Sequence, residues 1–184
     1  MDSLFDDVVA RLERGNHVLF SKTSPCLERL SQMLGEVDHR TTVLWALSFV
    51  PDMVQQLEVK HPGEMRPSLA LSSAWAWARG EIRMREAQRR ILDCHALAKE
   101  LDDPVDVALC HAIGQACSVV HTAGHALGLP MYELTAIVLS SGFDAVGPRI
   151  VEYQERLEWW STHTDTYKGP WASFLSTASR KERK

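Results

Sequence analysis

The sequence predicts an all-α protein, a single-domain bundle of about seven to eight helices around one buried central helix. Segments with helical periodicity are joined by short loops rich in Gly and Pro, as in helix bundles. There is no hairpin signal and no sustained alternation of apolar and polar residues that would indicate β-strands. The run 107–132 contains no Asp, Glu, Lys or Arg, although 24% of the whole chain is charged, and this favours a helix buried on every side.

Capping residues and helix breakers predict the first helices. A Ser-x-x-Asp pattern at 3–6 is typical of a helix N-terminus, and a Gly-Asn pair at 15–16 ends that helix. Ser24 is an N-cap that precedes a proline at the first helical position, and a glycine at position 35 ends this second helix. Asp38 begins the next segment. Pro51 lies inside it, so either the helix kinks there or a second helix begins at that proline.

The remaining helices follow the same logic of Pro or Asp at the start and Gly at the end. Their predicted spans are 67–80, 81–101, a central helix at about 104–128, a helix from 130 to 141, and a last one at about 148–162. Residues 165–184 are predicted to form a partly ordered tail.

Length and composition favour one soluble domain over residues 1–184 and exclude several functional classes. A net charge of −4 argues against nucleic-acid binding, which usually needs a basic surface. The four cysteines form no CxxC pair and read as reduced thiols, and the acidic N-terminus lacks the features of a signal peptide, so we expect a cytoplasmic protein. The uncharged run is long enough to span a bilayer, but its three His, one Gln and one Pro argue against a membrane segment.

The central helix carries the residues with the most chemistry. On a continuous helix, Cys117, His121 and His125 would stand at i, i+4 and i+8 along one face, a spacing that can hold zinc. Thr122 occupies the position where zinc proteases place their catalytic Glu, so the general base is absent. The other interpretation is that these histidines are core residues, hydrogen-bonded to the backbone or to a facing helix.

His95 lies on the inner stripe of the preceding helix and is expected to face His121 or His125. The three histidines would then form either a small polar network in the core or a metal site.

Tryptophans are the candidates for a partner-binding surface. Trp77 ends the helix before Gly80, where it can line a groove or pack in the core. Trp159 and Trp160 are adjacent on the last helix, so at most one of them can point inward. The sequence contains no Walker loop, no dinucleotide-binding glycine motif and no nucleophile elbow, so we expect no catalytic residue and no cofactor.

Four blocks along 40–137 carry a resemblance to a known family. They are His39-Arg40 with Leu44-Trp45-Ala46; Arg66-Pro67 leading into Ala74 through Glu81; Ala87 through Ala96; and Ala112 through Ala116 followed by Val120-His121, Gly124-His125-Ala126 and Tyr132. In this order they resemble the Imm-5-like immunity proteins of bacterial toxin–immunity systems, with 40–140 as the family-like core. Cys94, Cys110 and Cys117 do not belong to that pattern, so the histidine trio is the shared element.

The resemblance implies a cytoplasmic, non-catalytic, all-α protein that binds a cognate toxin and blocks it. Such a role needs a rigid surface that buries about 800 Å² per partner and is anchored on aromatic residues. The candidate anchors are Trp77, Trp159 and Trp160. The alternative is a metal-binding helical protein, or a metal-dependent enzyme, that uses His95, His121 and His125 with zinc.

Overall fold

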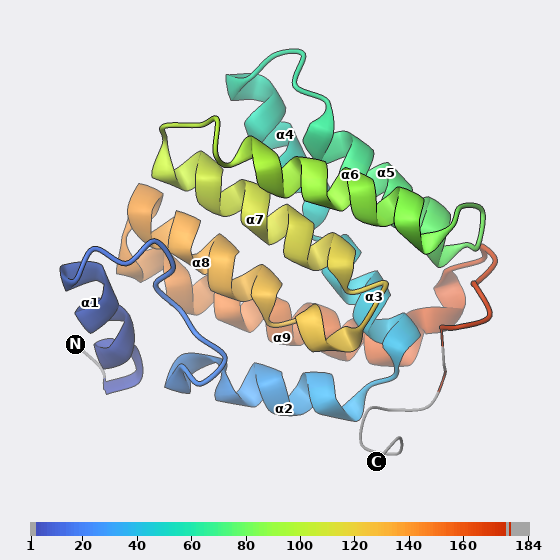
Figure 1. Ribbon diagram of the computed structural model, residues 1–184. Coiled ribbons are helices and arrows are strands. Elements are labelled where there is room, and N and C mark those ends of the chain that lie inside the picture. Colours follow the sequence, from blue (N-terminus) through green and yellow to red (C-terminus); the bar gives the residue numbers. More distant parts are fainter. Residues whose placement is uncertain (1–2, 176, 178–184) are drawn as a thin grey trace.

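The computed structural model describes residues 3–175 and residue 177, and these form helices joined by loops, without a β-strand (Figure 1). The predicted all-α fold class is confirmed. The α-helices are α1 (Asp6–Glu13), α2 (Glu28–Glu36), α3 (His39–Leu47), α4 (Val50–Lys60), α5 (Arg66–Ala78), α6 (Met84–Leu97), α7 (Pro104–Ser118), α8 (Gly128–Ser141) and α9 (Val146–His163). Short 3-10 helices are η1 (Ser3–Phe5), η2 (Pro25–Leu27), η3 (Ala123–His125), η4 (Phe143–Ala145) and η5 (Thr164–Thr166).

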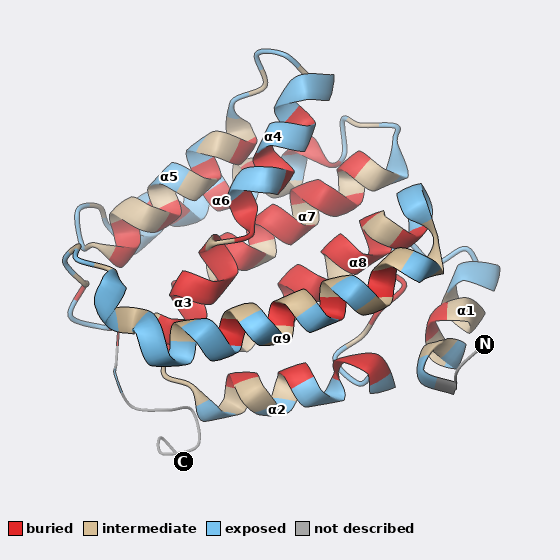
Figure 2. Ribbon diagram, turned by 180° about the vertical axis from the view of Figure 1, so that it is seen from behind, coloured by how far each residue is buried: buried red, intermediate tan, exposed pale blue. Residues whose placement is uncertain are grey.

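Helix α7 is the axis of the bundle. It contacts α3, α4, α5, α6 and α8, and Figure 2 shows buried residues along α3, α7 and α8. Its alanines and Gly114 allow close helix packing, since small side chains let neighbouring helices approach. No helix in the described part of the chain is both long and apolar enough to cross a membrane.

The central helix is shorter than the predicted span 104–128, because α7 ends at Ser118. The buried His39 of α3 donates from Nε2 to the carbonyl of Val119 at 2.6 Å, which satisfies an acceptor at the helix end. Thr122 then accepts a hydrogen bond from the Gly124 amide and begins η3. The expectation that Cys117, His121 and His125 share one helical face is therefore wrong.

The other predicted boundaries hold to within a few residues. Asp38 and Asp103 cap α3 and α7 by accepting hydrogen bonds from backbone amides, as predicted from the Asp residues themselves. The segment containing Pro51 is divided into α3 and α4, with that proline in the first turn of α4. Gly80 and Gly142 end their helices at φ 77° and 81°, in the left-handed region that glycine tolerates.

An aromatic cluster joins α3 to α9 in the core. Trp45 and Tyr153 are both fully buried, and the indole Nε1 of Trp45 donates to the carbonyl of Tyr153 at 2.9 Å. The ring of Phe49 contacts both residues edge-on, at 5.7 Å from Trp45 and 5.0 Å from Tyr153. This cluster fixes α9 against α3 and so holds the C-terminal helix on the bundle.

The segment after α9 folds back over α5. The Ala172 amide donates to the Ala78 carbonyl at 2.8 Å, and Arg40 Nε donates to the carbonyl of Leu175, whose side chain is buried. Of the predicted partly ordered tail 165–184, residues 176 and 178–184 lie outside the described residues.

Candidate functional site

The three histidines predicted from sequence line one cavity of about 300 Å³, together with Trp77. The cavity lies between α5, α6, the end of α7 and the turn that follows it. Its lining residues are Trp77, Met84, Gln88, Ile91, Leu92, His95, Gln115, Ser118, His121 and His125. We call it the histidine cavity. The early end of α7 allows His121 and His125 to reach it, because both lie in the turn between α7 and α8.

Two histidines share a hydrogen bond at the back of this site. The Nδ1 atoms of His95 and His111 lie 2.9 Å apart, so one ring donates and the other accepts. The ring of His111 also packs on Tyr132, with centroids 5.1 Å apart. Burial, together with the nearby imidazoles of His111 and His125, lowers the pKa of His95 to about 4. Burial also lowers the pKa of His111 and of His125, so the imidazoles of His95, His111 and His125 are neutral at pH 7.

Two glycines make room for the polar side chains of the cavity. A Cβ atom on Gly114 would lie 2.3 Å from Nε2 of His95, and one on Gly128 would lie 2.4 Å from Oε1 of Gln115. That same Oε1 lies 3.2 Å from Nδ1 of His125 and accepts its hydrogen bond. The shape of the cavity thus depends on having glycine, and no larger residue, at these two positions of α7 and α8.

The variant Gly114→Ala is expected to lower the free energy of unfolding by about 1–3 kcal/mol, because the new methyl group displaces the His95 ring. Urea unfolding measures the loss, and the His95 ring resonances should shift in the NMR spectrum. Gly35→Ala is the matched control, since Gly35 is also helical and a Cβ there meets nothing within 4 Å. It should be neutral or stabilising by up to about 1 kcal/mol. Equal effects of the two variants would contradict the packing described.

Aromatic rings form one wall of the histidine cavity. The rings of Trp77 and His121 stack with centroids 5.9 Å apart and an interplanar angle of 21°. Trp77 is only 5% exposed, so a partner reaches it only through the cavity. Phe174, about half exposed, contacts the indole of Trp77 from the C-terminal segment.

The candidate metal-binding residues do not form a ligand set among the described residues. Within residues 3–175 and 177, no three His, Cys, Asp or Glu side chains are arranged to hold a metal ion. Cys117 is fully buried, and burial raises the pKa of its thiol, which disfavours the thiolate that zinc binds. His95, His121 and His125 instead contact His111, Trp77 and Gln115.

The predicted tryptophan pair lies near the end of α9. Trp159 is 45% exposed and stacks on His163, with centroids 4.4 Å apart and rings almost parallel. Trp160 is partly buried and packs against the core. Trp159 is thus the exposed member of the pair and Trp160 the member against the core, and their rings meet edge-on with centroids 4.7 Å apart.

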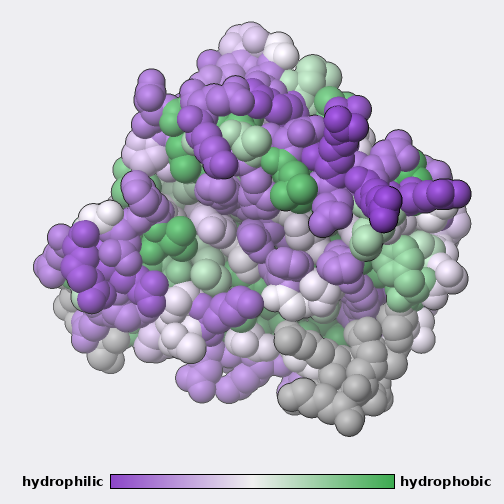
Figure 3. Space-filling model, in the orientation of Figure 1, coloured by the Kyte–Doolittle hydropathy of each residue, from purple (hydrophilic) through white to green (hydrophobic). Residues whose placement is uncertain are grey.

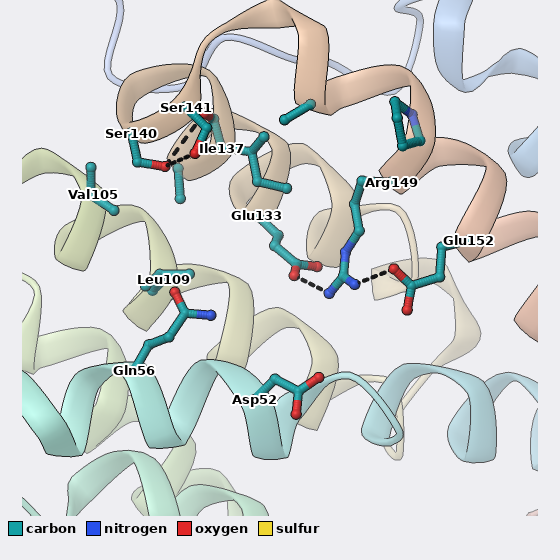
Figure 4. A pocket seen from close by; sticks show the side chains of 13 residues that line it. Asp52, Gln56, Val105, Leu109, Glu133, Ile137, Ser140, Ser141, Arg149 and Glu152 are labelled. Carbon is teal, nitrogen blue, oxygen red and sulfur yellow. Dashed lines mark hydrogen bonds and ion pairs between the residues drawn. The ribbon is translucent and has the colours of Figure 1, made fainter.

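A second cavity, of about 380 Å³, was not predicted from the sequence. It lies between α4, α7, α8 and α9, and Figure 4 shows Glu133 and Arg149 pointing toward one another within it, with Asp52 on the opposite wall. Arg149 forms an ion pair with Glu133 and a second one with Glu152, with Nη1 2.5 Å from the carboxylate oxygen. We call it the Glu133 groove. Its lining includes three acidic side chains and one arginine, whereas the histidine cavity is lined by no Asp, Glu, Lys or Arg.

Glu133 is the buried member of this network, with a side chain only 6% exposed. Burial raises the pKa of its carboxyl, while Arg149 and the donated hydrogen bond of Tyr153 oppose that shift. Burial also opposes the charge of Arg149, but the Glu133 carboxylate outweighs it and raises the pKa of the guanidinium. The signal was present in the sequence, since Glu133 is the sole charged residue between Asp106 and Asp144.

The chain matches a known protein family. A family model described as Imm-5 like putative immunity protein matches residues 32–163, a span that reaches from α2 to the end of α9. No curated protein and no solved structure matches the chain. The matched span contains every residue that lines the histidine cavity and the Glu133 groove.

Proposed function

Because the chain belongs to the Imm-5-like immunity protein family, we propose that it neutralises a cognate bacterial toxin by binding it directly, without catalysis. The observation that carries this proposal is the family match, which covers well over half of the chain. The proposal needs no bound metal or cofactor and no catalytic residue of the immunity protein. Its chemistry is that of a protein–protein interface.

A rigid frame with exposed apolar side chains supports a binding role. Figure 3 shows that the face carrying α6, α7 and α8 is largely hydrophilic, with apolar side chains in separate groups. On α6, Met84 and Leu92 are exposed beside the histidine cavity, and Trp159 is exposed on α9. Exposed aromatic and apolar side chains of this kind are the usual anchors of an interface that buries about 800 Å² per partner. Because α6 and α9, which carry these side chains, pack against neighbouring helices of the bundle, the backbone positions of the anchors are set before binding.

Co-expression tests the proposal. We expect the product of a toxin-like reading frame beside this gene to arrest growth when expressed alone, and the present chain to restore growth when both are induced. An immunity protein from an unrelated toxin system, expressed to the same level, serves as the control and should not rescue. Unchanged toxicity in the presence of the folded chain, with no complex recovered from the cells, would overturn the proposal.

A further inference from the structure

We propose that the histidine cavity receives one uncharged aromatic side chain of the toxin, and that this cavity is the central anchor of the interface. The inference rests on the proposed function, because it names the part of that partner that is bound. Interfaces commonly concentrate their binding energy in one desolvated pocket that receives an aromatic side chain, surrounded by contacts that exclude water.

The histidine cavity has an uncharged lining. The residues that line the histidine cavity include no Asp, Glu, Lys or Arg, although charged residues make up 24% of the chain. The Glu133 groove, by contrast, contains Asp52, Glu133, Arg149 and Glu152. An uncharged pocket favours an uncharged occupant, because a charged side chain would lose its hydration there without gaining an opposite charge. The histidine cavity therefore selects against Lys, Arg, Asp and Glu.

The size and shape of the histidine cavity suit one aromatic ring. A cavity of about 300 Å³ is at the lower end of the range for small-ligand pockets, and it suits one ring system better than a peptide segment. Its wall of stacked Trp77 and His121 offers an aromatic surface, against which another ring can pack edge-on or with an offset. The side chains of Ile91 and Leu92 supply the aliphatic part of the lining.

The lining of the histidine cavity also offers groups that can form hydrogen bonds. A neutral imidazole has one donor and one acceptor nitrogen, and the amide of Gln115 can both donate and accept. Because Nδ1 of His125 donates to Oε1 of Gln115, Nε2 of His125 is left as an acceptor and the amide nitrogen of Gln115 as a donor, so the cavity holds both kinds of group without a charge. Phenol and indole are the aromatic side chains with a polar group on an apolar ring, which matches this lining. We infer that the inserted residue of the toxin is Tyr or Trp.

Exposed apolar side chains form the rim of the histidine cavity. Leu92 is 58% exposed, and Met84 and Phe174 are each nearly half exposed. Met84 and Leu92 line the cavity, while Phe174 contacts Trp77 beside it. A protein that inserts a ring into the cavity would also cover these side chains, whereas a small molecule inside the cavity would leave the exposed parts in water. The rim therefore favours a protein partner as the source of the aromatic group.

The test blocks the cavity from its exposed edge. Gln88 is exposed on α6 and lines the cavity, so Gln88→Trp places an indole at its entrance without disturbing a buried position. Gln56→Trp is the matched control, because Gln56 is also exposed and lines the Glu133 groove instead. Calorimetric titration with the purified toxin should show binding at least about 30-fold weaker for Gln88→Trp and within about 3-fold of the wild type for Gln56→Trp. Thermal unfolding of both variants checks that they remain folded.

The outcomes separate the cavity from the general role. Absence of toxin binding by the wild type rejects the proposed function itself, and the cavity inference with it. Binding by the wild type that Gln88→Trp leaves unchanged rejects the cavity alone and leaves the toxin-binding role standing. A change in the molar mass of the chain by itself on Gln88→Trp, seen by light scattering, shows that a second copy occupies the cavity and rejects the inference. Alanine substitution of each exposed Tyr and Trp of the toxin should identify one residue whose loss matches the effect of Gln88→Trp.

Discussion

Replacement of Arg149 by methionine is expected to lower the free energy of unfolding at pH 7 by about 3–5 kcal/mol. Arg149 is the cation that pairs with Glu133, whose side chain is 6% exposed. In the variant, the Glu133 carboxylate keeps only the hydrogen bond that the Tyr153 hydroxyl donates. An ionised carboxylate held in the interior without a countercharge is strongly unfavourable. Urea unfolding followed by circular dichroism measures the loss.

The pH dependence of this variant identifies its cause. Without Arg149, the pKa of Glu133 in the folded state rises further above its value in the unfolded chain. The folded state then holds a proton that the unfolded chain releases, so the deficit relative to the wild type is larger at pH 7 than at pH 5 and shrinks as the pH falls toward about 4.5. Replacing Glu133 as well, in the double variant Glu133→Met with Arg149→Met, should recover most of the loss, because no uncompensated charge remains.

An exposed ion pair provides the control for Arg149→Met. Arg90 lies 3.8 Å from Asp93 on α6, and both side chains are nearly half exposed. Arg90→Met should therefore change the free energy of unfolding by less than about 1 kcal/mol. A loss of under 1 kcal/mol in Arg149→Met, or a deficit equal at pH 7 and pH 5, would contradict the description of Glu133 as a buried, paired carboxylate.

Acidification is expected to destabilise the protein through the histidine cavity. The pKa of His95 is about 4 in the folded state, against about 6.5 in an unfolded chain. Below pH 6.5 the unfolded chain binds a proton that the folded state does not, so stability falls as the pH drops from about 6.5 to about 4. His95 alone should cost about 1–2 kcal/mol between pH 7 and pH 5, allowing for its partial exposure. His111 and His125, whose pKa values are also lowered, add in the same direction.

Substitution of His95 tests this assignment. His95→Gln removes one of the titrating groups and should reduce the loss of stability between pH 7 and pH 5 by about 1–2 kcal/mol. If His95→Gln unfolds with the wild-type dependence on pH, the neutral and buried state of His95 is wrong.

Local signals were enough to predict most of the fold. Asp38 and Asp103 are of the residue type that caps helices, and both accept hydrogen bonds from the first turn of the helix that they precede. The sequence pattern does not show where α7 ends, because the contact that helps to end the helix joins His39 to Val119 across 80 residues. Helical periodicity cannot reveal such a contact, since it depends on how α3 packs against α7.

The candidate site was predicted in part and for a reason that proved wrong. His121 and His125 were grouped with His95 because a continuous helix would place them on one face. They meet instead because the chain leaves the helix after Ser118 and turns over the cavity. The role of Gly114 depends on the ring of His95 from another helix, so sequence spacing could not show it.

In the Glu133 groove, the sequence shows the buried carboxylate but not the residue that pairs with it. A lone carboxylate in an apolar helix was visible in the sequence and indicates a buried partner. Which of the chain's arginines supplies that partner depends on the packing of α8 against α9, and this identifies Arg149.

Hydrogen exchange on the complex with the purified toxin tests the central claim most directly, that the chain neutralises its toxin by binding it through the face of the histidine cavity. We expect a 1:1 complex in which the amides of 84–95 and 118–125 exchange more slowly than in the free chain. The amides around Asp52 and Gln56 in α4 should exchange at the same rate in both states. Absence of a complex, or protection confined to surfaces away from α6 and the turn after α7, would contradict the account.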